Sequence, residues 1–445
     1  MIITLPEDVK NIIERLKDCG HEAYAVGGCV RDTVLGKTPA DWDITTSAKP
    51  QQVKEIFSKT FDTGIEHGTV TVLLNHVGYE VTTYRIDGEY EDGRHPKQVE
   101  FTSSLEEDLK RRDFTINAMA YNDNQGLVDL FGGMEDLDKG VIRCVGNPME
   151  RFDEDALRML RALRFAAQLD FEIDSKTIDA IVELAPTIEK VSKERIMVEL
   201  VKMLVSDHPD RLREVVSCGL SKYFLPELDV MFETEQNNKH HCYTVGEHTM
   251  QALLNVPNDK ILRLTMLLHD VAKPLVKKTD ETGVDHFKTH PIVGADMAVE
   301  ILRRLKFDNN TISKVKKLVL HHDDRPVATE KAVRRAAVKM GPECFPEIFA
   351  VKRADTLAQS TWNREEKLRE IDDFENIYHN IIEQNQCISK KDMMVNGRDI
   401  MDLGAPQGKI IGEVLDRLFE EIVDDPELND RDYLIIRAKQ LLGEI

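Results

Sequence analysis

The chain has 445 residues, of which 41% are hydrophobic and 31% charged, and its formal net charge at pH 7 is −21. This length is enough for roughly two to four domains, and the composition is typical of a soluble globular protein. The negative charge argues against a general nucleic-acid binder, although one local basic segment would suffice for an RNA contact.

No apolar run is long enough to span a membrane, and residues 1–10 lack the basic and apolar stretches of a signal peptide. The seven cysteines form no C-x-x-C pair, which is typical of a protein from a reducing compartment. We therefore predict a cytoplasmic protein with no membrane partner.

A helix over residues 6–19 and a strand over residues 23–26 are predicted to lead into Gly27-Gly28-Cys29-Val30-Arg31-Asp32. Glycine has no Cβ, so the backbone at Gly27 and Gly28 can approach a polyphosphate closely. We predict that these glycines and Arg31 bind a triphosphate, and that Cys29 is a packing residue.

Two carboxylates separated by one residue follow, in the segment Asp41-Trp42-Asp43-Ile44. In an extended strand, side chains two positions apart point to the same side, so both carboxylates should lie together in front of an inward-facing Ile44. Magnesium prefers oxygen ligands and shares its remaining positions with water and phosphates. We predict that Asp41 and Asp43 are catalytic and hold magnesium. Solvated acids on a turn are the alternative, which the nearby glycines and Arg31 disfavour.

The next predicted elements are a helix over 50–57 and a hairpin whose strands cover 69–74 and 79–85, joined by residues 75–78. Glu80, on the second strand, is a candidate third acid near the metal; a cross-strand partner or solvent is the alternative. Residues 86–99 are rich in glycine and charge, which predicts a mobile loop.

Residues 111–120 place two guanidiniums, an acid and an amide before a predicted small-residue helix start. Arginine suits bidentate contacts to phosphate, and Asp113 or Asn117 is suited to bond a ribose hydroxyl. We predict that Arg112, Asp113 and Asn117 bind a nucleotide.

From about residue 149 the hydrophobic period becomes helical, and one helix is predicted over residues 153–166. Asp155 and Arg158 would then stand three residues apart on one face, where an ion pair is the simplest interpretation. A fixed carboxylate beside a guanidinium also matches the hydrogen-bonding edge of a base.

In order and spacing, four motifs resemble those of the class II tRNA nucleotidyltransferases, within the polymerase β-like superfamily that also holds the bacterial poly(A) polymerases. They are Gly27-Gly28-x-Val30-Arg31-Asp32, Asp41-x-Asp43, Arg111-Arg112-Asp113-Phe114-Thr115-x-Asn117-Ala118 and Glu154-Asp155-x-x-Arg158. The resemblance covers about the first half of the chain. It implies an α+β protein, with a mixed α/β head around a small antiparallel-rich sheet, followed by an all-α neck, an HD domain and a tail.

The resemblance also implies roles for the neck. Asp155 and Arg158 would select CTP and ATP, with Glu154 orienting Arg158, and Arg161 completes the predicted nucleotide-binding set. The segment from Glu194 to Glu199 would brace this region. In the family, the loop corresponding to residues 86–99 is implicated in the switch from C to A addition, and enzymes that add only C lack it, so its presence favours the full reaction.

Eight of the fourteen histidines fall between His240 and His322. Their order resembles the HD phosphohydrolase superfamily, with an adjacent His-Asp pair on a helix predicted over 264–271. The resemblance implies divalent transition metals, the second of them bound by His290 and either His321 or His322. The predicted ligands are His248, His269, Asp270, His290, His321, His322 and Asp355. An active hydrolase and a scaffold that contacts tRNA are both consistent with this set.

Eight basic residues between Lys314 and Lys339 outnumber three acidic ones, so they form either a tRNA track or a solvated helix face. A charged helix is predicted over 364–383, and residues 395–412 resemble the family's tail. We predict a catalytic head (1–148), a base-selecting neck (149–225), an HD domain (226–365) and a tRNA-contacting tail (366–445).

The resemblance, together with these motifs, implies template-independent addition of CCA to tRNA from CTP and ATP, with release of pyrophosphate. A poly(A) polymerase is one alternative, and a metal-dependent nucleotide or cyclic-phosphate phosphohydrolase with a degenerate head is another. The sequence leaves open the metal and activity of the HD site, whether one chain adds both C and A, the tRNA-contacting residues and the oligomeric state.

Overall fold

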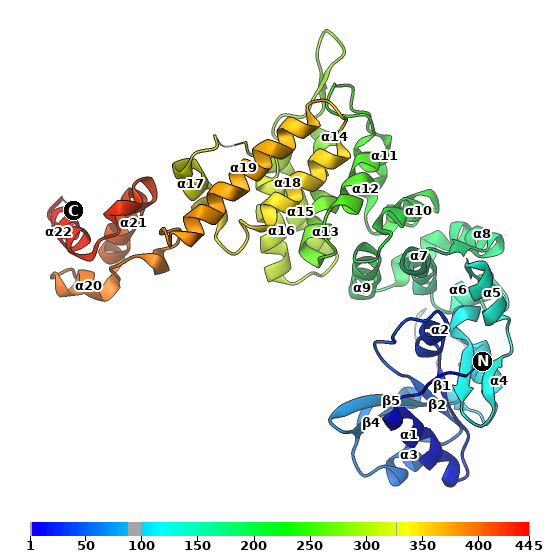
Figure 1. The fold of residues 1–445 in the computed structure, drawn as a ribbon. Coiled ribbons are helices and arrows are strands. Elements are labelled where there is room, and N and C mark those ends of the chain that lie inside the picture. The colour runs from blue at the N-terminus through cyan, green and yellow to red at the C-terminus, as the bar shows by residue number, and fades with distance from the viewer. Residues whose placement is uncertain (1, 88–98, 326, 445) are drawn as a thin grey trace. The chain divides into compact units, whose positions relative to one another are not determined.

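A computed structural model describes residues 2–87, 99–325 and 327–444. Its contacts divide the chain into two compact units, Met1–Pro226 and Glu227–Ile445. The predicted fold class is confirmed, because a mixed α/β head with a mostly antiparallel sheet is followed by helices (Figure 1). No helix among the described residues is long and apolar enough to cross a bilayer.

The head is built on a seven-stranded sheet in the order β3-β4-β5-β2-β1-β8-β9. All neighbouring strands are antiparallel except β2 and β5, which run parallel. The strands are β1 (Ala23–Val26), β2 (Ile44–Thr46), β3 (Thr60–Gly64), β4 (Thr69–Leu74), β5 (Val77–Thr83), β8 (Met119–Asn122) and β9 (Gly126–Asp129). A separate ribbon pairs β6 (Arg85–Asp87) with β7 (Val99–Phe101).

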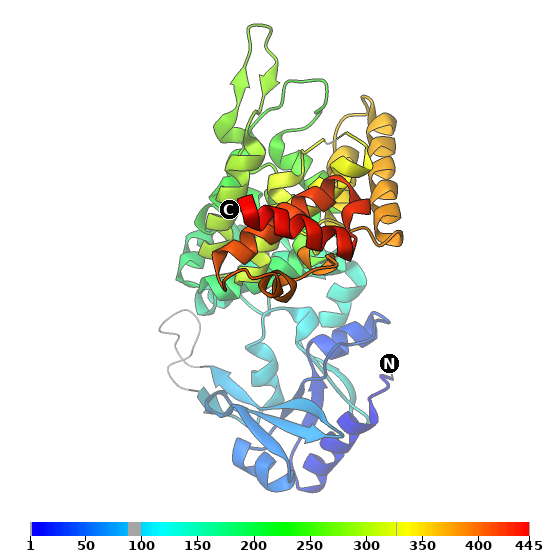
Figure 2. The ribbon, with the colours of Figure 1, turned by 90° about the vertical axis from the view of Figure 1, so that its left-hand side faces the viewer.

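Helices α1 (Glu7–Asp18) and α3 (Pro50–Ile56) lie side by side on one face of this sheet (Figure 1, Figure 2). The sequence dictates this for α1, since its buried residues Val9, Ile12, Ile13 and Leu16 recur at helical spacing. The short α2 (Gly28–Val34) follows β1, and α4 (Leu105–Lys110) and α5 (Gly133–Lys139) complete the head.

The predicted hairpin is confirmed, but the bounds of its second strand differ from the prediction. Strand β5 begins and ends two residues earlier than predicted, and Leu74 pairs with Val77. The connection is therefore only Asn75-His76, whose φ angles are 49° and 67°. Such a two-residue turn needs positive φ at both positions, which asparagine tolerates better than most residues. Most of the predicted loop over 86–99 lies outside the described residues.

The predicted helix start within residues 111–120 is wrong. Thr115–Asn117 form a single 3-10 turn, and the chain then enters β8, which pairs with β1 in the interior of the sheet. Met119, Ala120 and Tyr121 are all buried, as expected for a strand covered on both faces. A short continuous apolar run of this kind has no period that separates strand from helix.

The neck contains α6 (Pro148–Glu154), α7 (Leu157–Leu169), α8 (Ser175–Leu184), α9 (Lys193–Leu204) and α10 (Leu212–Ser217). The strands β10 (Val141–Ile142) and β11 (Glu172–Ile173) pair in parallel and join it to the head. The single helix predicted over 153–166 is wrong, because the helix breaks at Asp155, whose backbone is extended (φ −144°, ψ 102°). The Asp155 carboxylate instead accepts a hydrogen bond from the Leu157 amide at 3.1 Å, a local bond with which aspartate competes against helix.

The second unit is almost entirely helical. Its helices are α11 (Pro226–Glu233), α12 (Val245–Asn255), α13 (Lys260–Leu268), α14 (Lys273–Val276), α15 (His290–Arg304), α16 (Asn309–His321), α17 (Glu330–Met340), α18 (Glu347–Ala358), α19 (Arg364–Glu383), α20 (Gly397–Asp402), α21 (Lys409–Asp424) and α22 (Arg431–Glu444). The ribbon β12 (Lys278–Thr279) and β13 (Asp285–His286) is its only sheet among the described residues. The predicted helix over 364–383 is confirmed as α19.

Helix α13 occupies the middle of the HD region, since it contacts α12, α16 and α18. Every residue from Leu262 to Leu268 is buried, so the residues that follow the helix also enter the interior. The helix ends three residues earlier than predicted, and His269 and Asp270 therefore lie just beyond its C-terminus.

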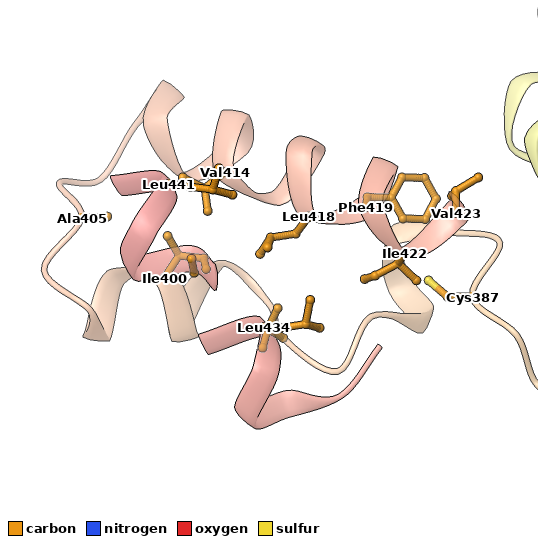
Figure 3. Close-up of a cluster of buried hydrophobic side chains, with 12 residues drawn as sticks. Cys387, Ile400, Ala405, Val414, Leu418, Phe419, Ile422, Val423, Leu434 and Leu441 are labelled. Carbon is orange, nitrogen blue, oxygen red and sulfur yellow. The ribbon is translucent and has the colours of Figure 1, made fainter. Parts of the chain in front are cut away.

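The tail has its own hydrophobic core, formed by α20, α21 and α22 around Leu418 (Figure 3). We expect Leu418→Ala to lower the free energy of unfolding of this region by about 2–5 kcal/mol, because the fully buried side chain leaves a cavity. Hydrogen exchange along α20–α22 measures the effect. Met401→Ala is the control, since Met401 is 40% exposed and its loss should change exchange little.

Candidate active site and metal centre

Asp41 and Asp43 lie in the segment that enters β2, and not within the strand as predicted. Asp43 is still aligned with the sheet, because its carbonyl accepts a hydrogen bond from the Val26 amide at 3.0 Å. In the parallel pair β2 and β5, Ile44 is opposite Val81, which brings Glu80 next to Asp43. Asp43 and Glu80 line a cavity of about 190 Å³ together with Arg112.

The charges around Asp43 fit a divalent cation. The pKa of Asp43 is raised to about 6 by desolvation from the surrounding chain together with the negative charges of Asp41 and Glu80, although the side chain reaches the surface and Arg112 opposes the shift. A carboxylate that is costly to ionise beside two other acids is stabilised by a bound cation. Glu80, which the sequence suggested only as one of several alternatives, is thus part of the acidic site.

Without divalent metal, we expect Asp43→Asn to raise the Tm at about pH 8. The pKa of Asp43 is about 6 in the folded chain against an ordinary 3.8, so the folded state binds this proton more tightly than the unfolded state. Ionised Asp43 therefore costs stability above pH 6, and the cost disappears as the pH falls towards the unfolded value. The Tm difference should shrink through this window and vanish near pH 3.5, as thermal melts in a chelator would measure. Equal melting temperatures at pH 8 would contradict the assignment.

Four predicted nucleotide-binding residues form one chain of hydrogen bonds. Arg31 Nη1 donates to Asn117 Oδ1 at 2.7 Å, and Asn117 Nδ2 donates to Asp113 Oδ1 at 3.2 Å. Arg161 Nη2 then donates to Asp113 Oδ2 at 2.6 Å. Burial alone would raise the pKa of Asp113, but the Arg161 guanidinium holds it well below its usual range. This series of hydrogen bonds links Arg31, which follows Gly27 and Gly28 in the head, to Arg161 on helix α7 of the neck.

Gly27 allows the close approach predicted from its missing Cβ, although the nearest group is an arginine of the chain. A Cβ at Gly27 would lie 3.1 Å from Arg112 Nη1, and its φ of +81° is in the left-handed region. Arg112 therefore lies across the glycine backbone while it faces the cavity of Asp43. The structure thus brings Gly27 and Arg112, both predicted to bind the nucleotide, to the cavity of Asp43.

The ion pair between Asp155 and Arg158, which was the simpler alternative to base selection, is not found among the contacts of the described residues. Asp155 pairs with Arg195 of α9, with atoms 2.7 Å apart, and Arg158 Nη1 donates to Glu154 Oε2 at 2.6 Å. The helix break explains why Asp155 and Arg158 have different partners, because it removes Asp155 from the helix face that carries Arg158. On the same α9, Glu199 pairs with Arg164 at 2.9 Å, so this helix holds both the break and α7 in position.

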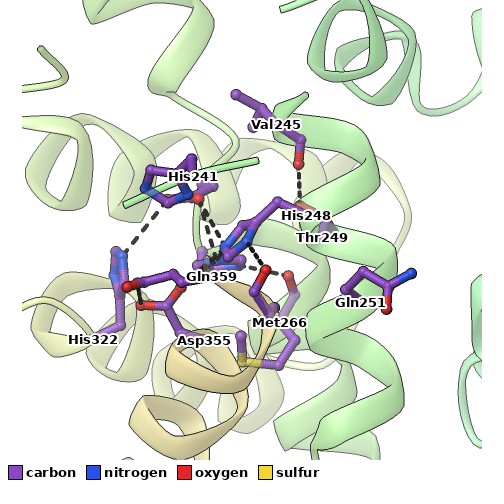
Figure 4. A network of polar contacts seen from close by, with 12 residues as sticks. His241, Val245, His248, Thr249, Gln251, Met266, His322, Asp355 and Gln359 are labelled. Carbon is purple, nitrogen blue, oxygen red and sulfur yellow. Dashed lines mark hydrogen bonds and ion pairs between the residues drawn. The ribbon is translucent and has the colours of Figure 1, made fainter. Parts of the chain in front are cut away.

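A second cluster lies at the centre of the HD region, where His248 of α12, Asp355 of α18 and His322 after α16 come together (Figure 4). Two groups could each hold a metal ion, with all ligand atoms of a group within 4.8 Å of one another. The first is His248, His269 and Asp270, and the second is Asp270, His290 and His322. Asp355 joins the first group, since its Oδ1 is 3.0 Å from His248 Nε2.

The four histidine rings are oriented in the same way. Each places Nδ1 near a backbone carbonyl, which leaves Nε2 directed inward. The Nδ1 contacts are His248 to Ala358 at 3.3 Å, His269 to Met266 at 2.7 Å, His290 to Phe287 at 2.8 Å and His322 to Val319 at 2.7 Å. Opposed Nε2 atoms lie 3.2 Å apart in His248 and His269 and 3.1 Å apart in His290 and His322. Converging imidazole nitrogens beside a shared carboxylate suit a divalent transition metal.

His321 does not belong to this cluster, contrary to its place in the predicted ligand set. Its Nδ1 contacts Asp324 Oδ2 at 2.7 Å, and its side chain lines a different cavity from that of the metal ligands. Consecutive helical residues point about 100° apart, so only one of His321 and His322 can face the site.

Three family models match the chain: a poly A polymerase head domain over residues 23–143, a probable RNA and SrmB-binding site of polymerase A over 170–232, and an HD domain over 239–360. The CCA-adding enzyme of Ligilactobacillus salivarius is 38% identical over 461 residues, covering 100% of this chain and 99% of that protein. The chain belongs to the CCA-adding enzyme family. The Enterococcus faecalis member is 55% identical over 207 residues, covering 46% of this chain and 51% of the relative.

Solved structures of the family agree with this assignment. A crystal structure of the Bacillus stearothermophilus CCA-adding enzyme in complex with CTP covers 99% of this chain and 100% of its own, with a TM-score of 0.73 and 29% identity. A Thermotoga maritima CCA-adding enzyme complexed with tRNA_CCA matches 99% of this chain and 96% of its own at 21% identity and a TM-score of 0.55, which supports the fold alone.

Two further side chains, Lys273 and His241, contact the cluster of histidines and aspartates in the HD region (the HD cluster), and the sequence did not predict either of them. Lys273 Nζ lies 2.7 Å from Asp270 Oδ2, and its position three residues after Asp270 was the available signal. His241 packs edge-on against His248, with ring centroids 5.1 Å apart. Burial, together with the charges of Lys273 and His248, lowers the pKa of His241 to about 2, so the ring is neutral at physiological pH.

The basic side chains between Lys314 and Lys339 are all engaged by acidic side chains, although Asp424 serves two of them. Each of the eight basic side chains forms an ion pair with a carboxylate, which favours the structural interpretation over an RNA track. The pairs are Lys314–Glu347, Lys316–Asp296, Lys317–Glu343, Arg325–Asp323, Lys331–Asp424, Arg334–Glu330, Arg335–Asp424 and Lys339–Asp324.

Proposed function

We propose that this chain binds tRNA lacking its 3′ end and adds C, C and A from CTP and ATP without a nucleic-acid template, releasing pyrophosphate. The observation that carries the proposal is the cavity that unites Asp43, Glu80 and Arg112 in a chain matched along its whole length by a CCA-adding enzyme. Carboxylates for a metal beside a guanidinium for phosphate are the groups that nucleotidyl transfer requires.

Asp41 and Asp43 would hold magnesium in this site. When bound, magnesium would lower the pKa of the attacking 3′ hydroxyl and neutralise the departing pyrophosphate. The chain itself supplies the remaining functions. Arg112 offers its guanidinium to the phosphates beside the Gly27 backbone, while the bonds from Arg31 through Asn117 and Asp113 fix the surrounding residues.

The neck would choose the base through Asp155 and Arg158, which are held in place by Arg195 and Glu154. We expect Arg158→Lys to reduce the discrimination of CTP and ATP against UTP and GTP by about 1–3 kcal/mol, because lysine lacks the planar fork that matches a base edge. Competitive single-nucleotide incorporation measures this ratio. The control is Arg164→Lys on the same helix, which should alter stability through Glu199 but not base choice.

We further propose the division into a head (1–148), a neck (149–225), an HD domain (226–365) and a tail (366–445). The boundary between the two compact units, after Pro226, supports the division between neck and HD domain. The separate hydrophobic core of the last three helices supports a distinct tail.

The deciding experiment incubates the protein with a tRNA transcript that ends at the discriminator base, together with CTP and ATP, and sequences the 3′ ends. Ends that read CCA support the proposal. A homopolymeric A tail would instead identify a poly(A) polymerase, and an end of CC would limit the chain to C addition.

The converging Nε2 atoms of the HD cluster favour a second activity, a metal-dependent phosphohydrolase acting on nucleotides or cyclic phosphates. His248, His269, Asp270, His290, His322 and Asp355 would hold divalent transition metals, which activate water for attack on phosphorus. Lys273 lies beside Asp270 and lines the cavity next to the cluster, where it could contact a substrate phosphate.

A further inference from the structure

Asp108 is a fully buried carboxylate at the base of the head site. It lies on α4 with 0% of its surface exposed, and no step of nucleotide addition described so far uses it. Burying an ionised carboxylate is expensive unless several hydrogen bonds satisfy it. The bonds that Asp108 makes therefore indicate its function.

The Asp108 carboxylate accepts hydrogen bonds from two arginines and from one threonine of strand β2. Its Oδ1 accepts hydrogen bonds from Arg111 Nε at 3.0 Å and Arg111 Nη2 at 2.8 Å. Its Oδ2 accepts from Thr45 Oγ1 at 3.0 Å and lies 3.4 Å from Arg112 Nη2. Thr45 is on β2, two residues after Asp43, so one carboxylate joins the metal-binding segment to the arginine pair.

Arg112 is held on two sides by these contacts. Its Nη2 faces Asp108 and its Nη1 lies against the Gly27 backbone, while the side chain lines the cavity of Asp43 and Glu80. Its Nε is buried and donates no hydrogen bond to any described residue. The guanidinium is thus fixed in direction while its side chain lines the cavity.

We propose that Asp108 is a positioning residue, which orients Arg112 towards the phosphates of the incoming CTP or ATP. The inference rests on the proposed nucleotide addition and adds to it a residue that never touches the substrate. A carboxylate is suited to this task because its two oxygens accept from Thr45, Arg111 and Arg112 together. An asparagine at this position would replace one accepting oxygen with an NH2 group, which is a donor and cannot accept a hydrogen bond from an arginine N–H.

The test is steady-state kinetics of single C and A additions by Asp108→Asn. We expect the KM for CTP and the KM for ATP each to rise about tenfold, as for the loss of one hydrogen bond to a charged group. The kcat should change less than about threefold, because the lost contact binds ground state and transition state alike.

Asp136→Asn is the matched control. Asp136 is also a buried carboxylate of the head, and like Asp108 it accepts from one threonine hydroxyl, that of Thr115, but it pairs with a single arginine, Arg143, that is not part of the site. It should lower the Tm to a similar extent and leave both KM values within about twofold of the wild type. Equal KM values for the two variants would overturn the inference.

A double-mutant cycle shows whether the effect passes through Arg112. In an Arg112→Ala background, Asp108→Asn should cause no further rise in KM, whereas an additive rise would assign Asp108 a merely structural role. If Asp108→Asn does not fold, Thr45→Val removes one of its bonds without changing a charge. That variant should raise KM about threefold, and an unchanged KM would overturn the inference.

The outcomes also separate this inference from the proposed function. A wild-type chain that extends tRNA while Asp108→Asn keeps its KM leaves nucleotide addition intact and removes Asp108 from it. A wild-type chain that neither extends tRNA nor binds CTP in a calorimeter contradicts both.

Discussion

Asp41→Asn and Asp43→Asn should each reduce nucleotide addition at least about 1,000-fold, the cost of losing several kcal/mol of metal-based charge stabilisation. The amide keeps the size of the carboxylate and removes its charge. Since ionised Asp43 is costly in the folded chain, its replacement should not unfold the head. Extension of a tRNA transcript in the presence of magnesium measures the rate.

Two controls make this result specific. Asp62→Asn removes an exposed carboxylate of the same sheet, whose partner is Lys54, and should leave the rate unchanged. Magnesium should raise the Tm of the wild type and have little effect on that of Asp43→Asn, because binding only to the folded state stabilises it. Extension by either active-site variant at more than a tenth of the wild-type rate would contradict the assigned carboxylates.

The head site could be predicted because its chemistry is carried by short contiguous segments. Gly27-Gly28 and Asp41-x-Asp43 each identify a chemical function by residue type and spacing, and β1 and β2 bring both to one place. The contribution of Glu80 depends on the parallel register of β2 and β5, which no local pattern specifies. Asp108 was missed because a buried acid within Glu106-Glu107-Asp108 looks in sequence like part of an exposed helix start.

The neck shows where local periodicity fails. Residues 153–166 have a helical pattern throughout, yet the carboxylate of Asp155 bonds the Leu157 amide and pairs with Arg195, 40 residues away. A tertiary partner of this kind overrides propensity and cannot be found by spacing. In the HD region, the order of the ligands was enough to find the cluster. The choice between His321 and His322 needed the rotation at the end of α16, which a sequence does not specify within one residue.

The two metal groups of the HD cluster share one ligand, which leads to a second large effect. We expect Asp270→Asn to abolish metal binding altogether, because Asp270 belongs to both groups. His248→Ala and His322→Ala should each remove one ion of two, since each histidine belongs to a single group. Elemental analysis after loading with a divalent transition metal and dialysis gives the stoichiometry. Hydrolysis of a nucleotide or cyclic phosphate should fall with the metal in all three variants.

His321→Ala provides the decisive comparison, because His321 is buried next to His322 but faces Asp324 instead of the cluster. It should retain both ions and its hydrolytic activity. CCA addition should persist in every one of these variants, as the carboxylates proposed to hold magnesium lie in the other compact unit. Asp270→Asn also removes the charged partner of the buried Lys273, which then keeps only its neutral contacts with Gln236 and His241, so a lower Tm is expected for this variant. Loss of CCA addition in His322→Ala, with its fold intact, would mean that the two sites depend on each other.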